Sequence, residues 1–245
     1  MSSTTTTTPT PKLTVHHLQI GQGERIPFLL EELNLPYTLI LHQRDPFFSP
    51  PELKAIHPTG ASPVLEDATF TPNSPLILAE SGAITEYIIQ RHGAGRLALP
   101  PSHPNYADYL YWLHFSNSTL QPAIFRRFLA RSLASSPEDP KFLTQDQRTK
   151  ANLAQLNKRL EANTWLAGDE FTAADTMMVW CLTTMRMFEP VDLTGHEGTL
   201  AWLKRATDRE GYRRAHEKMD PELDIEELRS AKGPTPFKPK PRAKV

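Results

Sequence analysis

The sequence is poor in cysteine and in long apolar runs. Cys181 is the only cysteine among 245 residues, which excludes a disulfide within the chain and any metal site built on several cysteines. No apolar run reaches the roughly 18–20 residues that a membrane-spanning helix needs, and residues 1–11 lack the apolar core of a secretory signal. We therefore expect a cytoplasmic protein with no membrane span.

An excess of charge of one sign is also lacking. The chain carries 27 Lys and Arg against 28 Asp and Glu, so its formal net charge is −1 and no overall field attracts nucleic acid. Its 9 histidines show no spacing typical of a metal site, and the neighbours His16 and His17 would point to opposite faces of a strand. We expect neither a nucleic-acid partner nor a bound metal.

Residues 12–94 predict a small α/β domain. Its segments are LTVHHL, ERIPFLLEEL, YTLILH, PELKAIHP, SPVLED, LILA and SGAITEYIIQRHG, in the order β-α-β-α-β-β-α. This order gives a compact unit with too few strands for a doubly wound domain.

Residues 103–229 predict a second, all-helical domain after a boundary that contains Gly and Pro. Its helical patterns cover residues 105–133, 144–163 and 173–188, with shorter ones around Leu200 and Tyr212. The Thr-rich leader, residues 1–11, and the basic, proline-rich tail, residues 230–245, are expected to be disordered.

Glu80 and Ser81 stand where the strand LILA meets a helix. Capping is one interpretation, because Ser is a favoured N-cap and an acid complements the helix dipole. A ligand site is the other, because a helix N-terminus binds a carboxylate and Glu80 could hold an ammonium. Taken alone, the two residues favour capping.

Pro63 opens the next motif, GASPVLED. Proline cannot donate to a strand ladder, so it belongs at a sheet edge or in a special turn. A cis Ser62–Pro63 bond would turn the chain and leave the backbone of Val64 free to pair with an extended ligand. The nearby LILAESG favours that cis bond.

These motifs, the β-α-β-α-β-β-α order and the helical second half together resemble the cytosolic glutathione transferases, from about Leu13 to about Met219. The phrase ELKAIHPTGASPVLED…LILAESGAITEYI is similar to the fungal group that includes the yeast enzymes, and FTAADTMM resembles the family's capping box, with Thr172 and Asp175. The resemblance implies a thioredoxin-like domain followed by an all-helical one, a homodimer, and glutathione as co-substrate or cofactor.

The resemblance also implies roles for individual residues. Ser81 would hold the γ-glutamyl carboxylate of glutathione and Glu80 would help with its ammonium, while Val64, after Ser62 and Pro63, would pair with the cysteinyl amide. The glycyl carboxylate has three candidate partners, because Phe48 and Ala61 replace basic residues found in many members. They are Arg44, Lys54 and His57. A solvated helix face for Lys54 and a helix-end role for His57 are the alternatives.

Gly21 stands at the position where family members have the residue that contacts the thiol of glutathione. Members place a Ser or Tyr hydroxyl there to stabilise the thiolate, but no Ser, Thr, Tyr or Cys lies between His17 and Arg25. Backbone N–H groups of Gln22 and Gly23 could replace the hydroxyl, and this is the interpretation we favour. The side chain of Gln22 or Arg25 could do so instead, or the site could bind glutathione with little chemistry at sulfur.

The family's electrophile site lies between the domains, along the first helix of the second one. In this sequence the matching residues are Tyr109, Trp112, Phe115, Ser116, Asn117 and Arg126. An aromatic stripe at helical spacing is more often core than pocket, so we expect about half of these to be structural.

Three functions are compatible with these residues. The first is a transferase that adds glutathione to a small hydrophobic electrophile. The second is a glutathione-dependent isomerase, in which the thiol adds reversibly to a conjugated olefin, for example in fungal secondary metabolism. The third is a non-catalytic binding or regulatory protein, which the missing hydroxyl favours and the intact motifs around Pro63 and Ser81 oppose.

Overall fold

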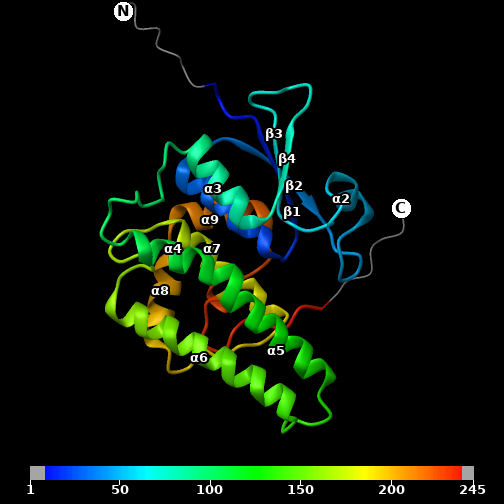
Figure 1. Cartoon of the computed structure of the whole chain (residues 1–245). Coiled ribbons are helices and arrows are strands. Elements are labelled where there is room, and N and C mark those ends of the chain that lie inside the picture. Colours follow the sequence, from blue (N-terminus) through cyan, green and yellow to red (C-terminus); the bar gives the residue numbers. More distant parts are fainter. Residues whose placement is uncertain (1–8, 239–245) are drawn as a thin grey trace, which may run out of the picture.

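A computed structural model describes residues 9–238. Most of the predicted leader and the end of the predicted tail lie outside these residues. Figure 1 shows an α/β domain, coloured blue to cyan, above a larger helical domain, coloured green to orange. The predicted fold class is therefore confirmed.

The α/β domain has one mixed sheet of four strands, in the order β2-β1-β3-β4. β1 pairs in parallel with β2 and antiparallel with β3, and β3 pairs antiparallel with β4. The strands are β1 (Leu13–Leu18), β2 (Tyr37–His42), β3 (Val64–Asp67) and β4 (Leu76–Ala79). The helices are η1 (Gln22–Glu24), α1 (Arg25–Leu33), α2 (Pro51–Ile56) and α3 (Ser81–Arg91).

The helix α1 joins the two domains. Nearly all its residues are buried, because it packs against α3 of its own domain and against α7 and α9 of the helical domain. The loop that precedes α1 is thereby held between the domains. This is the loop in which Gly21 replaces the expected hydroxyl residue.

The helical domain is built around α7, in which every residue is buried. The predicted capping box of Thr172 and Asp175 opens this helix. The elements are α4 (Tyr106–Phe115), η2 (Ser116–Leu120), α5 (Gln121–Leu133), α6 (Pro140–Ala162), α7 (Ala173–Leu182), η3 (Thr184–Met187), α8 (Glu197–Thr207), α9 (Glu210–Met219) and α10 (Ile225–Leu228). No helix within residues 9–238 is long and apolar enough to cross a membrane.

The segment 230–238 differs from the disorder that its composition predicts. The buried guanidinium of Arg186 donates to the carbonyl oxygens of Ser230 (2.9 Å) and Ala231 (2.7 Å), and the N–H of Phe237 donates to the carbonyl of Met187 (2.8 Å). We call residues 230–238 the C-terminal strap. In Figure 1 the strap, in red, passes from the helical domain toward β2 and α2.

Candidate functional site

Glu80 and Ser81 lie where the sequence predicts, at the junction of β4 and α3. Glu80 has φ 71°, a left-handed conformation that is uncommon outside glycine and is found mainly at functional sites. Its side chain is exposed and makes no capping hydrogen bond. The carboxylate of Glu80 is therefore free of the capping role that the sequence also allowed.

The buried side chain of Arg25 donates a hydrogen bond to the neighbouring Ser81. Its side chain is 1% exposed, and burial lowers the pKa of its guanidinium. Its Nε donates to the carbonyl of Met177 (2.7 Å). Its Nη1 contacts the oxygens of Gln22 (3.3 Å), Ser81 (3.2 Å), Asn117 (2.5 Å) and Gln121 (3.0 Å). One buried cation thus ties together side chains of both domains.

The Ser81 hydroxyl is polarised by this arrangement. Its oxygen accepts from Nη1 of Arg25 (3.2 Å) and from Nδ2 of Asn117 (3.1 Å). A hydroxyl has two acceptor lone pairs and one donor hydrogen, so both acceptor positions are occupied. The hydrogen of Ser81 is left to donate to a third group, such as a carboxylate.

Asn117 belongs to a π-helical segment, η2, that interrupts the helix expected over residues 105–133. Such segments are often found at functional sites. Asn117 bonds Arg25 and Ser81 at once, and Gln121, just after η2, bonds Gln22 through its Nε2 (3.0 Å). The interruption therefore brings two amides to the domain interface.

The loop before β3 confirms the predicted cis bond between Ser62 and Pro63. The hydroxyl of Ser62 is tied to β1, since it accepts from the N–H of Leu18 (3.0 Å). Val64 then begins β3, opposite His16 on one side and Ala79 on the other, and it is fully buried. The prediction that its backbone is free to pair with a ligand is therefore wrong, because strands of the sheet flank it on both sides. The Ser62–Pro63 motif and the Glu80–Ser81 motif thus lie at the same end of the β3–β4 pair.

Gly23 and Gly21 differ in what surrounds them. A Cβ on Gly23 would collide with the ring of His17 and would lie 2.8 Å from Ser62 Oγ, so close packing requires glycine there. Gly21 has an extended backbone, with φ −167°, that any residue can adopt. A Cβ there would lie 2.9 Å from the carbonyl of Leu18 and 3.2 Å from Nη2 of Arg44.

Glu24 lies beneath the Gly21 loop and was not singled out by the sequence. Its carboxylate is 4% exposed and accepts hydrogen bonds from the hydroxyls of Thr183 (2.9 Å) and Thr184 (2.7 Å) in the helical domain. Burial raises the pKa of Glu24 to about 7. It is a buried acid at the domain interface.

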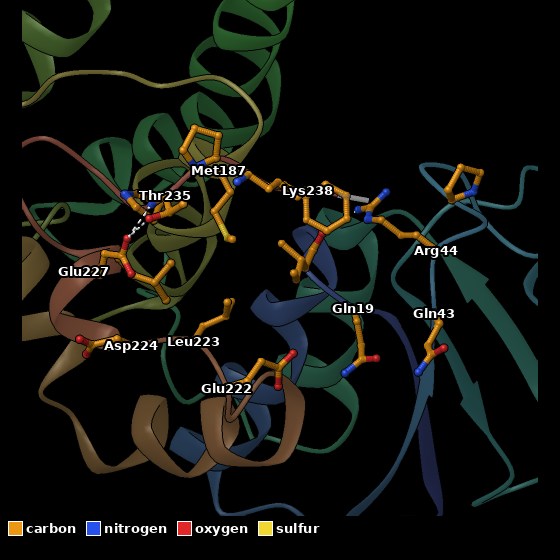
Figure 2. Close-up of a pocket in the computed structure, with 16 residues that line it drawn as sticks. Gln19, Gln43, Arg44, Met187, Glu222, Leu223, Asp224, Glu227, Thr235 and Lys238 are labelled. Atoms are coloured by element: carbon orange, nitrogen blue, oxygen red, sulfur yellow. Dashed lines mark hydrogen bonds between the residues drawn. The ribbon is translucent and has the colours of Figure 1, made fainter. Parts of the chain in front are cut away.

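A cavity of about 480 Å³ opens beyond the C-terminal ends of β1 and β2. Figure 2 shows Gln19, Gln43 and Arg44 on its α/β-domain side, facing Leu223 and Glu227 from the C-terminal region. The outer half of the strap, residues 234–238, completes the wall. The cavity begins at Ile20, so it lies directly beside Gly21.

The comparisons with known proteins agree on one family. Residues 22–91 match the N-terminal domain of glutathione S-transferases and residues 118–210 match their C-terminal domain. Glutathione S-transferase GstB of Escherichia coli is 33% identical over 62% of this chain and 72% of its own length. The chain belongs to the glutathione S-transferase family.

Fungal and bacterial glutathione S-transferases cover most of the chain. Glutathione S-transferase 3 of Schizosaccharomyces pombe is 28% identical over 85% of this chain and 88% of its own length. A glutathione S-transferase structure from Actinobacillus pleuropneumoniae has a TM-score of 0.76 at 28% identity, over 87% of this chain and 95% of that one. The transferase URE2P8 of Phanerochaete chrysosporium, solved with oxidized glutathione, shares the fold at 20% identity, with a TM-score of 0.68 over 88% and 97% of the two chains.

Within this glutathione S-transferase fold, the candidates for the glycyl carboxylate lie apart. Lys54 is exposed on α2 and its side chain covers Gly60. His57 ends α2, where its Nδ1 lies 2.8 Å from the hydroxyl of Thr59. Arg44 faces the cavity on the other side of the Gly21 loop.

The predicted electrophile residues lie on α4, η2 and α5, and most of them are part of the core. Four of them are at most 4% exposed: Tyr109, Trp112, Phe115 and Ser116. Asn117 joins the Arg25 network, and Arg126 is exposed on α5. None of the six lines the 480 Å³ cavity.

Proposed function

We propose that this protein binds reduced glutathione and adds its thiolate to a small hydrophobic electrophile. The observation that carries the proposal is the Ser81 hydroxyl, whose two acceptor positions are filled by Arg25 and Asn117. A hydroxyl held in this way presents its hydrogen to an incoming carboxylate. Exposed Glu80, beside it, suits the ammonium of the same γ-glutamyl group.

With the γ-glutamyl group held at Ser81, positions follow for the other parts of glutathione. Its cysteinyl part would lie against the loop of Ser62 and the cis Pro63, its glycyl carboxylate would approach Lys54 and His57, and its sulfur would face Gly21. In the transfer step the S–H proton leaves to solvent and the sulfur lone pair forms the new C–S bond. The displaced electron pair departs with a leaving group, or takes up a proton when the electrophile is an olefin.

The electrophile would occupy the cavity beside Ile20 rather than the α4 residues. Half of the residues that line the cavity are apolar, including Ile20, Leu223 and Phe237, and the cavity adjoins the expected sulfur position. Hydrophobic co-substrates suit such a lining.

Calorimetry with glutathione tests the anchor. Ser81→Ala removes a hydrogen bond to a charged group, so its dissociation constant for glutathione should rise by the equivalent of about 1–3 kcal/mol. Ser118→Ala, on an exposed turn of η2, is the matched control and should bind as the wild type does. Equal affinities for wild type and Ser81→Ala would refute the assignment.

S-alkyl glutathiones test the cavity. Each buried CH₂ contributes about 0.8 kcal/mol, so S-hexylglutathione should bind the wild type at least tenfold more tightly than glutathione, an order-of-magnitude expectation. Phe237→Ala should reduce this gain, whereas Phe125→Ala, 53% exposed on α5, should not. A gain unaffected by Phe237→Ala would place the alkyl group elsewhere.

Reversible thiol addition is a second candidate, favoured by the absence of a hydroxyl at Gly21. The thiolate adds to a conjugated olefin, the new single bond rotates, and the thiolate leaves with its electron pair as the double bond re-forms. Incubation with polyene metabolites of fungal type would then change double-bond geometry without consuming glutathione, and conjugation of an aryl halide would be slow. If both reactions fail while glutathione binds, a non-catalytic binding role is the remaining function.

A homodimer and a cytoplasmic location complete the proposal, because glutathione S-transferases are typically dimeric and soluble. Sedimentation at micromolar concentration should give twice the 27.7 kDa chain mass. A monomer mass would contradict the dimer.

A further inference from the structure

Arg44 occupies the space that a side chain at Gly21 would need. It follows β2 and reaches back to the Gly21 loop, where its Nη2 donates to the carbonyl of Ile20 (2.6 Å). The same Nη2 lies 3.2 Å from the position that a Cβ on residue 21 would take. The guanidinium is therefore next to the point from which the family hydroxyl would project.

The surroundings of Arg44 leave part of its donor capacity unused. Nη1 donates to the carbonyl of Phe47 (2.7 Å), but the buried Nε has no hydrogen-bond partner within residues 9–238. The group lies against the rings of Phe188 (5.0 Å) and Phe237 (6.0 Å). These rings exclude water from one side, which strengthens its interaction with an anion.

Several charged groups surround Arg44, and most of them are carboxylates. The carboxylate of Asp220, 2% exposed, accepts from the N–H of Ile20 (3.3 Å) and acts electrostatically on Arg44. The same cavity is lined by one further cation, Lys238, and by three carboxylates, those of Glu222, Asp224 and Glu227. No described residue forms a salt bridge with Arg44, so its positive charge is available to a ligand.

We propose that Arg44 stabilises the thiolate of bound glutathione in place of the hydroxyl that position 21 lacks. The inference rests on the proposed glutathione binding and names the group that activates the sulfur. The S–H proton leaves to solvent, the guanidinium keeps its own protons, and the sulfur anion is held by charge and by N–H donation. Arg44 then serves the sulfur rather than the glycyl carboxylate. It also takes the place of the backbone N–H groups of Gln22 and Gly23 as the main stabiliser of the thiolate.

Of the other side-chain candidates, Arg25 is already engaged, and Gln22 can offer only its uncharged amide N–H group. Nη1 of Arg25 serves four oxygens, and its Nη2 lies 3.4 Å from the sulfur of Cys181. Oε1 of Gln22 accepts from Arg25 and from Gln121. Of the two cations that line the cavity, Arg44 and Lys238, Arg44 is the one that contacts the Gly21 loop.

The test is an ultraviolet titration of the thiolate of glutathione bound to each variant. The wild type should bind glutathione with a thiol pKa below the value of about 8.5 for a free thiol. Arg44→Met should raise the bound pKa by about one unit or more, the shift expected for a lost charged hydrogen bond. Arg44→Lys should retain part of the lowering, and Arg91→Met, whose guanidinium covers the ring of Phe70, should leave the pKa unchanged.

Each outcome decides the proposal. Unchanged thiol pKa in Arg44→Met overturns it, and so does a rise of the same size in Gln22→Ala. Thermal unfolding shows whether Arg44→Met folds, and a thiol pKa in a folded Arg44→Lys as high as that of free glutathione would also overturn it. If the wild type binds glutathione and Ser81→Ala binds it weakly, the proposed function stands whichever result Arg44 gives. If the wild type fails to bind at all, the proposed function fails with the inference.

Discussion

The two ends of the proposed glutathione site are built in opposite ways. At the γ-glutamyl end, Ser81 accepts from the buried cation of Arg25 in its own domain and from the amide of Asn117 in the helical domain. At the thiol end, Gly21 has no side chain, a cavity opens beside it, and one guanidinium lies close. A dense hydrogen-bond network fixes the position of the γ-glutamyl group, whereas only a few protein groups lie near the sulfur. Substitutions in the network at the first end should therefore cost more stability than substitutions of the side chains that line the cavity at the second.

The largest effect is expected where the network is densest. Arg25→Met removes a buried cation and leaves the amides and hydroxyl around it without their donor. Breaking buried charged networks costs about 3–5 kcal/mol, so the free energy of unfolding in denaturant should fall by about this amount. Arg126→Met, exposed on α5, should change it by less than about 0.5 kcal/mol. Similar stabilities for the two variants would show that the network is not structural.

A smaller effect is expected from the buried acid beneath the Gly21 loop. Burial raises the pKa of Glu24 from 4.5 to about 7, so the folded protein holds this proton more tightly than the unfolded chain does. The contribution to stability is fully present below pH 4.5 and is lost as the pH rises to about 7. Over that window the loss amounts to about 3 kcal/mol.

Glu24→Gln keeps the shape and removes the titration. The amide can still accept from Thr184 and can donate to Thr183. The stability of this variant relative to the wild type should therefore rise between pH 4.5 and pH 7, as measured by denaturant unfolding at several pH values. Parallel pH curves for the two proteins would mean that Glu24 does not titrate in this window.

Asn117 allows the network at the γ-glutamyl end to be dissected. If Asn117 acts on glutathione by fixing the Ser81 hydroxyl, Asn117→Ala should weaken binding by about 1 kcal/mol in the wild type and by almost nothing in Ser81→Ala. A double-mutant cycle by calorimetry measures this coupling. Equal losses in both backgrounds would mean that Asn117 acts independently of Ser81.

The sequence predicted the fold because its signals are local. Strand and helix periodicities, the capping box at Thr172 and the proline at Pro63 each concern residues close together in the chain. The strap was harder, because its order depends on Arg186, which lies more than forty residues earlier and reaches its carbonyls at 2.9 and 2.7 Å. The composition of the strap shows its proline and its charge but not a distant hydrogen-bond donor such as Arg186.

The candidate site likewise contains residues that the sequence could predict and residues that it could not. The sequence placed Glu80 and Ser81 correctly at the strand-helix junction, because each belongs to a short motif. It named Arg44 as one of three candidates for the glycyl carboxylate, and it could not show that the guanidinium reaches the Gly21 loop, because spacing does not show where a long side chain turns. Gln121 was missed although it follows Asn117 by four residues, a spacing that puts two helical side chains on one face. Glu24 carried no signal, because its partners Thr183 and Thr184 are distant in sequence.

Restoring the family hydroxyl is expected to have the smallest effect. The absence of a hydroxyl at Gly21 suggests that Gly21→Ser should lower the pKa of the bound thiol. In the structure, however, its Cβ would lie 2.9 Å from the carbonyl of Leu18 and 3.2 Å from Nη2 of Arg44. The new hydroxyl would compete with Arg44 for the same space, so the thiol pKa should move by less than about half a unit, well under the shift for a full charged hydrogen bond.

The two groups can be separated by placing the same substitution in Arg44→Met. There the cation is gone and Met can turn into the cavity, so the carbonyl of Leu18, 2.9 Å from the new Cβ, is the remaining group that must shift. Gly21→Ser should then lower the bound thiol pKa by about one unit relative to Arg44→Met alone, because a hydroxyl donor again faces the sulfur. A thiolate titration of the single and double variants gives the comparison directly. Equal shifts in both backgrounds would mean that serine and Arg44 act at different places, and the thiol end would then hold two independent stabilisers.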